Sequence, residues 1–167
     1  MTVESSAPAR PPAPTGQAVP TGPVEHPGRV AARLARQVEV GLSEVDLSLP
    51  QYRILMLLDE GSVVASALAD RLTVTRPSVT AVVDGLVARG LVERQADGRD
   101  RRRVAHGLTD DGRRVLAAAD RAIDARLADI AGYLDDSADA DAAFGGLGVW
   151  RHALDAYRAT KAAQVTR

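Results

Sequence analysis

The sequence has no cysteine and no apolar run that approaches the roughly 20 residues needed to span a bilayer. Without cysteine, disulfide bonds and redox sensing through a thiolate are both excluded. The N-terminal segment also lacks the apolar core of a secretory signal. We therefore expect a cytoplasmic protein that has no membrane partner.

The patterns of enzymes and metal sites are missing from the sequence as well. The three histidines, His26, His106 and His152, lie far apart, and no histidine–histidine or histidine–carboxylate spacing suggests a metal site. Asp110 and Asp111 suit the positively polarised N-terminus of a helix better than acid–base catalysis. We expect no enzymatic activity, no cofactor and no metal.

Proline is concentrated in the first 23 residues, which contain six prolines and almost no large apolar side chain. Such a segment cannot bury enough surface to offset the entropy that it loses on ordering. We expect residues 1–23 to form a disordered tail, with a binding role as the alternative. Residues 24–167 are long enough to form one domain with a single core.

Residues 65–86 have the pattern of two short helices joined by a tight turn. Leu68 and Leu72 lie four residues apart and give the first helix an apolar face. Thr75 can cap the second helix, and Pro77 suits its first turn. This arrangement predicts a helix-turn-helix, in which the first turns of the second helix meet base edges in the major groove of DNA.

The second of these helices separates apolar from polar residues. Four apolar residues recur at helical spacing and form a buried face. The polar side near the N-terminus remains free to read DNA, and Arg76 is best suited to bond the O6 and N7 atoms of guanine. The buried face consists of Val79, Val82, Val83 and Leu86, and the reading face consists of Thr75, Arg76, Pro77, Ser78, Thr80 and Ala81.

Two short strands joined by an arginine-rich turn are predicted next. Gly90 ends the helix, and residues 91–95 and 103–108 can pair as strands. Asp97 and Gly98 between them both tolerate the positive φ of a tight hairpin turn. The turn continues as GRDRRR, and four guanidinium groups held there can enter a narrow, electronegative minor groove and bond phosphates. The hairpin therefore predicts a winged helix-turn-helix.

Charge is unevenly distributed, although the net charge is only −1. Residues 72–103 contain seven arginines against four acidic residues, whereas residues 116–167 contain six basic residues against eight acidic ones. An arginine run is usually only a solvated surface. Its place beside a predicted reading helix favours contact with phosphates instead.

Further helices are predicted on both sides of the winged unit. Ser48 and Gln51 have the spacing of a capping box, which opens a helix that is apolar nearly all round. Thr109 can cap a long helix whose apolar stripe suits pairing with another long helix. Residues 135–141 are predicted to be an acidic linker, and an amphipathic helix follows. Trp150 and Tyr157 on this helix are expected to be core residues of an interface, with a platform for a ligand as the alternative.

Two strings closely resemble the MarR family of bacterial transcriptional regulators. They are LADRLTVTRPSVTAVVDGLVARGLVER and DGRDRRRVAHGLTDDG, and the second matches the wing of that family. The sequence departs from the family pattern at Pro77 on the reading helix, and at His106 with Gly107 on the second strand. Of these departures, Pro77 puts one base contact in doubt but leaves the fold unaffected.

The resemblance implies roles for the residues of the wing. It places Arg102 in the minor groove and makes Asp100 the carboxylate that orients a guanidinium and holds the wing. Arg99 and Arg101 are left to contact phosphates.

The resemblance also implies a fold that is mainly α with a small β-wing and about six helices. Residues 48–109 form the winged helix-turn-helix, and residues 24–43 and 110–163 supply a dimerisation lobe. The expected function is that of a homodimeric repressor that binds a pseudo-palindromic operator in double-stranded DNA. The expected small-molecule effector lies between the two lobes, against Tyr52 and Arg53. The alternative is a winged-helix protein-interaction module without specific DNA binding.

Overall fold

The structure is a computed structural model of the 167-residue chain, and it describes residues 25–61, 63–96, 104–134 and 136–165. The predicted tail (1–23) and the arginine-rich turn (97–103) lie outside these ranges, so the prediction of a disordered tail stays a prediction. Across the described residues, none of the helices has the length and apolar character needed to cross a membrane.

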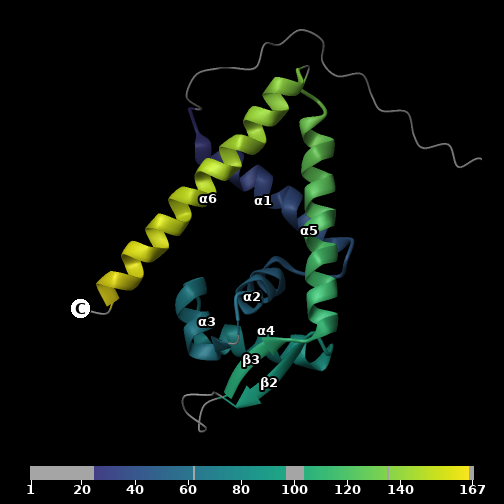
Figure 1. Ribbon diagram of the computed structural model, residues 1–167. Coiled ribbons are helices and arrows are strands. Elements are labelled where there is room, and N and C mark those ends of the chain that lie inside the picture. Colours follow the sequence, from purple (N-terminus) through teal and green to yellow (C-terminus); the bar gives the residue numbers. More distant parts are fainter. Residues whose placement is uncertain (1–24, 62, 97–103, 135, 166–167) are drawn as a thin grey trace, which may run out of the picture. The chain divides into compact units, whose positions relative to one another are not determined.

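The described residues form six α-helices and a three-stranded antiparallel sheet (Figure 1), which confirms the predicted fold class. In the sheet, β3 lies between β1 and β2 and pairs antiparallel with both. The short β1 leads directly into the helix-turn-helix. The elements are α1 (Pro27–Ser43), α2 (Leu49–Asp59), β1 (Val63–Val64), α3 (Ala65–Leu72), α4 (Arg76–Ala88), β2 (Val92–Ala96), β3 (Val104–Leu108), α5 (Asp110–Ala131) and α6 (Ser137–Val165).

The chain divides into two compact units, of which one contains residues His26–Ala128 and the other contains the described residues from Asp129 onward. The first unit holds one apolar core, to which α1 to α5 and the sheet all contribute. The buried face predicted for α4 is confirmed at Val79, Val83 and Leu86, whereas Val82 is half-buried. The largest fully buried side chains are Leu42, Ile54, Leu55, Leu68, Val79, Val83 and Leu86.

Two predicted N-caps set the start of α2 and α4. The Ser48 hydroxyl accepts a hydrogen bond from the Gln51 N–H (3.4 Å), and the Ser48 N–H donates to Gln51 Oε1 (2.9 Å). These two bonds complete the capping box at the start of α2. Thr75 accepts in the same way from the Ser78 N–H (3.4 Å), with Pro77 in the first turn of α4. Both caps confirm the sequence-based predictions.

The end of α4 explains why the first wing strand begins one residue later than predicted. Gly90 adopts φ 72°, which lets its N–H bond Val87 O (2.9 Å) and the Leu91 N–H bond Leu86 O (3.0 Å). These two bonds form a Schellman motif, which satisfies carbonyl groups left unpaired at the end of the helix. Leu91 therefore belongs to this cap, and β2 starts at Val92.

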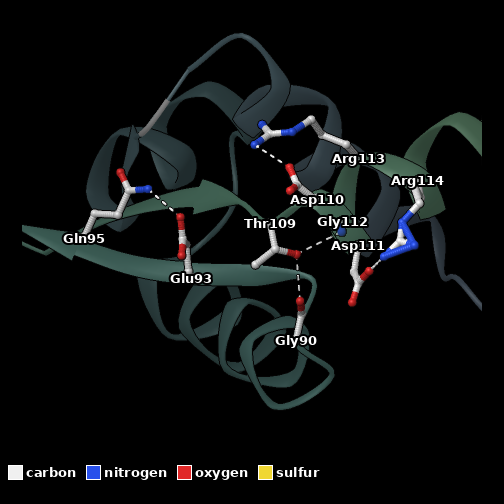
Figure 2. A network of polar contacts seen from close by, with 9 residues as sticks. All are labelled: Gly90, Glu93, Gln95, Thr109, Asp110, Asp111, Gly112, Arg113 and Arg114. Carbon is white, nitrogen blue, oxygen red and sulfur yellow. Dashed lines mark hydrogen bonds and ion pairs between the residues drawn. The ribbon is translucent and has the colours of Figure 1, made fainter.

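A half-buried threonine connects the end of this cap to the start of α5 (Figure 2). Thr109 Oγ1 accepts from the Gly112 N–H (2.9 Å) and donates to Gly90 O (2.7 Å). Gly112 lies so close to the backbone carbonyl of Leu91 that a Cβ atom there would overlap its oxygen. The predicted cap of α5 is confirmed, and the absence of a side chain at Gly112 allows α5 to pack directly on the Leu91 backbone.

The predicted acidic linker over residues 135–141 is wrong, because α6 begins at Ser137. Asp136 Oδ1 accepts a hydrogen bond from the Ala138 N–H (2.8 Å), as an N-cap side chain does. Asp139 lies in the first turn, where its charge complements the helix dipole. The acidic residues therefore start the helix and do not separate it from α5. The helix continues without interruption through Gly145 and the two glycines that follow.

Candidate nucleic-acid interface

All six residues of the reading face are exposed on the N-terminal half of α4 and its cap. Three of their hydroxyl groups are already held locally: Thr75 and Ser78 share a hydrogen bond (2.8 Å), and Thr80 Oγ1 donates to Arg76 O (3.0 Å). The backbone start of α4 is therefore rigid, while these hydroxyl oxygens keep acceptor capacity for a ligand. The arrangement agrees with the predicted division of α4 into a buried and an exposed side.

Arg76 is the long cationic side chain of this face. It is exposed, and no ion pair within the described residues involves it. A guanidinium at the first position of a helix also adds its charge to the positive end of the helix dipole. The site is therefore suited to an anion or to an acceptor pair such as guanine O6 and N7.

An ion pair that the sequence did not reveal joins α4 to the wing. Arg94 Nη2 in β2 donates to Asp84 Oδ1 in α4 at 2.6 Å. Both side chains are more than half exposed, so the pair contributes little to stability and mainly orients the two elements. Its two residues are ten apart in the sequence, on different elements, and no local spacing rule predicts such a contact.

β2 and β3 pair antiparallel, which confirms the pairing predicted for the two strands of the wing. Register pairs Val104 with Ala96 and His106 with Arg94, so Val104 and His106 share one face of the sheet. Val104 is 50% exposed near the tip, whereas His106 is buried. Arg99, Asp100, Arg101 and Arg102, which carry the predicted minor-groove and phosphate contacts, lie outside the described residues.

The structure separates the two residues predicted to line an effector site. Arg53 lines a pocket of about 350 Å³ whose walls come from α1, α2, the end of α3, and α4. Tyr52 lies outside that lining and donates its hydroxyl to Asp120 Oδ1 of α5 at 2.7 Å. Burial, the bond to Asp120, and the charges of Asp120 and Asp124 raise the pKa of Tyr52 well above its ordinary value. The other residues of the pocket are Glu39, Leu49, Pro50, Ile54, Leu72, Val74, Ser78, Val79 and Val82.

Comparison with known proteins places this geometry in a family. The sequence model of the MarR family matches residues 45–103, which run from before α2 to the end of the wing turn. The HTH-type transcriptional regulator FarR of Neisseria gonorrhoeae is 32% identical over 102 residues, which cover 59% of this chain and 70% of FarR. The chain belongs to the MarR family.

Another relative matches this chain over a shorter stretch of sequence. The transcriptional regulator AdcR of Streptococcus pneumoniae is 42% identical over 73 residues, which cover 44% of this chain and only 50% of AdcR. The chain thus matches about half the length of that relative.

A solved structure of the transcriptional repressor CouR bound to a 23-mer DNA duplex is similar to this MarR-family chain, with a TM-score of 0.60 and 30% identity. The likeness covers 74% of this chain and 88% of CouR. A second structure, of CouR from Rhodococcus jostii RHA1 bound to p-coumaroyl-CoA, has a TM-score of 0.56 at 30% identity over 59% of this chain and 71% of that one.

Proposed function

We propose that this protein is a transcriptional regulator that binds double-stranded DNA sequence-specifically. The observation that carries the proposal is the reading face on α4: a capped helix start beside the paired strands β2 and β3, with an exposed Arg76 that makes no ion pair among the described residues. In the proposed complex Arg76 bonds guanine in the major groove while Arg102 enters the adjacent minor groove. The name of FarR as a regulator and the DNA duplex bound by CouR support the same function.

The proposed regulator acts as a homodimer. Four large apolar side chains of α6 recur at intervals of three and four residues and are 42% to 64% exposed. This is the spacing of a seam that pairs with another helix, and a second copy of the chain is the proposed partner. Two reading helices related by a twofold axis would read half-sites about one helical turn apart. The side chains are Leu147, Trp150, Leu154 and Tyr157.

The proposed sign of regulation is repression, relieved by a small molecule in the Arg53 pocket. Most residues of the pocket are apolar, and Arg53 offers a cation, while the Glu39 carboxylate is paired with Arg36 at 3.4 Å. An effector with an apolar body and an anionic group directed at Arg53 fits this lining. Ser78 and Val79 of α4 also line the pocket. A ligand that fills it would therefore press on the helix that carries the reading face. That CouR is named a repressor and has been solved with p-coumaroyl-CoA supports this part of the proposal.

Selection of bound duplexes from a random DNA pool, followed by a salt titration of the winning sequence, tests the proposed function. An enriched palindrome whose affinity falls steeply with salt is the expected result, because bound phosphates release counterions. Absence of enrichment at low salt would overturn the proposal and favour the protein-interaction module.

The selected duplex then tests the effector. DNA affinity is measured with a panel of aromatic acids, antibiotics and metabolites, in the wild type and in Arg53→Ala. An effective acid should lose most of its influence in Arg53→Ala, while DNA affinity without ligand stays near that of the wild type. If no compound in a broad panel changes the affinity, the effector part of the proposal is wrong.

A further inference from the structure

His106 is a buried imidazole in the middle strand of the sheet. Its side chain is 6% exposed, and its Nδ1 atom has no hydrogen-bond partner among the described residues. The ring is hydrogen-bonded to the Val63 backbone in β1. If the ring gains a proton, Nδ1–H becomes a buried donor without an acceptor and the ring becomes a buried cation. Both changes are unfavourable.

The sheet register places this ring beside the ion pair that joins the wing to α4. Directly opposite His106 stand Val63 on one side and Arg94 on the other. Arg94 in turn reaches Asp84 of α4 at 2.6 Å. Val63, His106, Arg94 and Asp84 therefore form a continuous line of neighbouring residues from β1 through β3 and β2 to α4. A positive charge on His106 would lie next to the Arg94 guanidinium and would alter the contact by which β2 holds α4.

The charged groups that act on the ring come from two elements. Desolvation by burial is the largest cause, and it lowers the pKa of His106 from its ordinary value. The bond to the Val63 backbone opposes this shift, the charge of Arg94 adds to it, and the charge of Asp84 opposes it. The neighbouring strand β1 presents only Val63 and Val64. The helices α2 and α3, which also pack against β3, have apolar buried residues. Their charged side chains, Arg53, Asp59, Asp70 and Arg71, are exposed.

We propose that His106 is a proton-sensitive lock on the three-stranded sheet, whose protonation favours opening of the sheet and release of β2 and β3 from α4. In the closed sheet the neutral ring is favoured, and in the open sheet the ring reaches water and accepts a proton. Acid therefore shifts the balance toward the open sheet. The importance of this lock for gene regulation rests on the proposed DNA binding, because the open sheet would no longer hold the wing beside the reading face.

Amide hydrogen exchange on the full chain, followed by mass spectrometry at pH 7.5 and 5.5 and corrected for intrinsic rates, tests the lock. Once exposed, a histidine with a pKa near 6.5 is about tenfold more often protonated than neutral at pH 5.5. We expect protection in residues 92–96 and 104–108 to fall by about this factor in the wild type. In His106→Gln, which keeps a donor but has no titrating ring, protection should not fall. The same substitution in the exposed His26 or His152 serves as the matched control and should behave like the wild type.

An NMR titration of the wild-type histidines provides a test that does not depend on the folding of His106→Gln. Signals that disappear in His26→Gln and His152→Gln assign the third to His106. A midpoint below 6.5 with acid loss of sheet protection supports the lock. A midpoint at or above 6.5, or equal loss of protection in His106→Gln, overturns it.

DNA affinity separates the lock from the proposed function. At fixed salt, His106→Gln should retain more of its affinity for the selected duplex at pH 5.5 than the wild type does. Equal acid loss in both proteins would overturn the regulatory role of the lock. If no duplex is ever selected, the proposed function fails, while exchange and NMR still decide whether His106 controls the sheet.

Discussion

At the scale of single residues, much of the candidate interface depends on side chains that make few contacts with the rest of the fold. Arg76 is exposed and unpaired among the described residues, so its removal leaves the core intact. Tyr52 has the opposite character, because its ring is half-buried and its hydroxyl joins α2 to α5 through Asp120. Substitution at these two positions should therefore separate binding from stability.

Arg76→Ala should weaken binding to the selected duplex by about 1–3 kcal/mol, because it removes a side chain suited to two acceptors of one guanine. The melting temperature should hardly change, since surface substitutions usually alter stability by less than about 0.5 kcal/mol. Fluorescence anisotropy and thermal denaturation measure the two quantities. Arg36→Ala, on the exposed side of α1, is the matched control and should leave DNA affinity unchanged. If Arg76→Ala also lowered the stability of the fold by about 1–3 kcal/mol, Arg76 would be a structural residue.

Tyr52→Phe should lower the free energy of unfolding by about 1 kcal/mol, because it leaves Asp120 without its hydrogen-bond donor. The raised pKa of Tyr52 means that the folded protein keeps the phenolic proton when the unfolded chain loses it. This stabilisation is fully present below about pH 10 and is lost as the pH rises above it. The free energy of unfolding, measured with urea from pH 8 to pH 11, should therefore fall less steeply with rising pH in Tyr52→Phe than in the wild type. Tyr157→Phe, at an exposed position, should follow the wild-type curve.

At the scale of elements, local chemistry predicted where α2, α4 and α5 begin. The capping box at Ser48, the cap at Thr75 and the cap at Thr109 all use bonds between neighbours in sequence, so their spacing was sufficient. The linker was predicted wrongly because an aspartate favours both a loop and a helix start, and only the bond from Ala138 to Asp136 distinguishes them.

Contacts between elements could not be read from the sequence in the same way. The Asp84–Arg94 pair depends on how the sheet packs against α4, and the divergence of Tyr52 and Arg53 depends on which sides of α2 face α5 and the pocket. The buried Nδ1 of His106 likewise follows from its place between two strands, although its departure from the family pattern was visible. Long-range packing, which has no fixed sequence spacing, determines these features.

Gly112→Ala should lower the free energy of unfolding by about 1–3 kcal/mol, because the new Cβ would overlap the Leu91 carbonyl and neither backbone can move without disturbing the core. Gly85→Ala is the matched control. Gly85 lies within α4 with open space around its Cα, and alanine there should stabilise the protein by up to about 1 kcal/mol. Chemical denaturation measures both. A neutral Gly112→Ala would show that α5 shifts away from Leu91 at little cost.

At the scale of the whole molecule, apolar surface is unevenly distributed, and the proposed dimer accounts for this. The unit of residues His26–Ala128 has one core of buried apolar residues, although Val30, Met56, Val74 and Val104 are exposed, whereas no residue of α6 with a described side chain is buried. An exposed Trp150 with three further large apolar side chains is unfavourable in water unless another surface covers it.

Leu154→Asp should therefore dissociate the proposed dimer, raising its dissociation constant at least tenfold, because an unpaired carboxylate in an apolar interface costs about 2 kcal/mol or more. Sedimentation velocity over a concentration series measures the change, and circular dichroism checks that helix content is retained. Arg151→Asp introduces the same side chain on α6 outside the apolar stripe and should dissociate the dimer less. Unchanged sedimentation of Leu154→Asp would show that the stripe does not pair copies of this chain.

The bond made by Thr109 has a consequence for exchanging parts between related regulators. Because one hydroxyl holds the cap of α4 at Gly90 and the first turn of α5 at Gly112, the boundary between reading unit and long helix is not a point where the chain can be cut. A chimera that joins α4 of this chain to the α5 of another regulator should lose the Thr109 bonds and misfold at the junction between the two helices. A chimera that transfers residues 90–112 as one segment should keep both Thr109 bonds and fold.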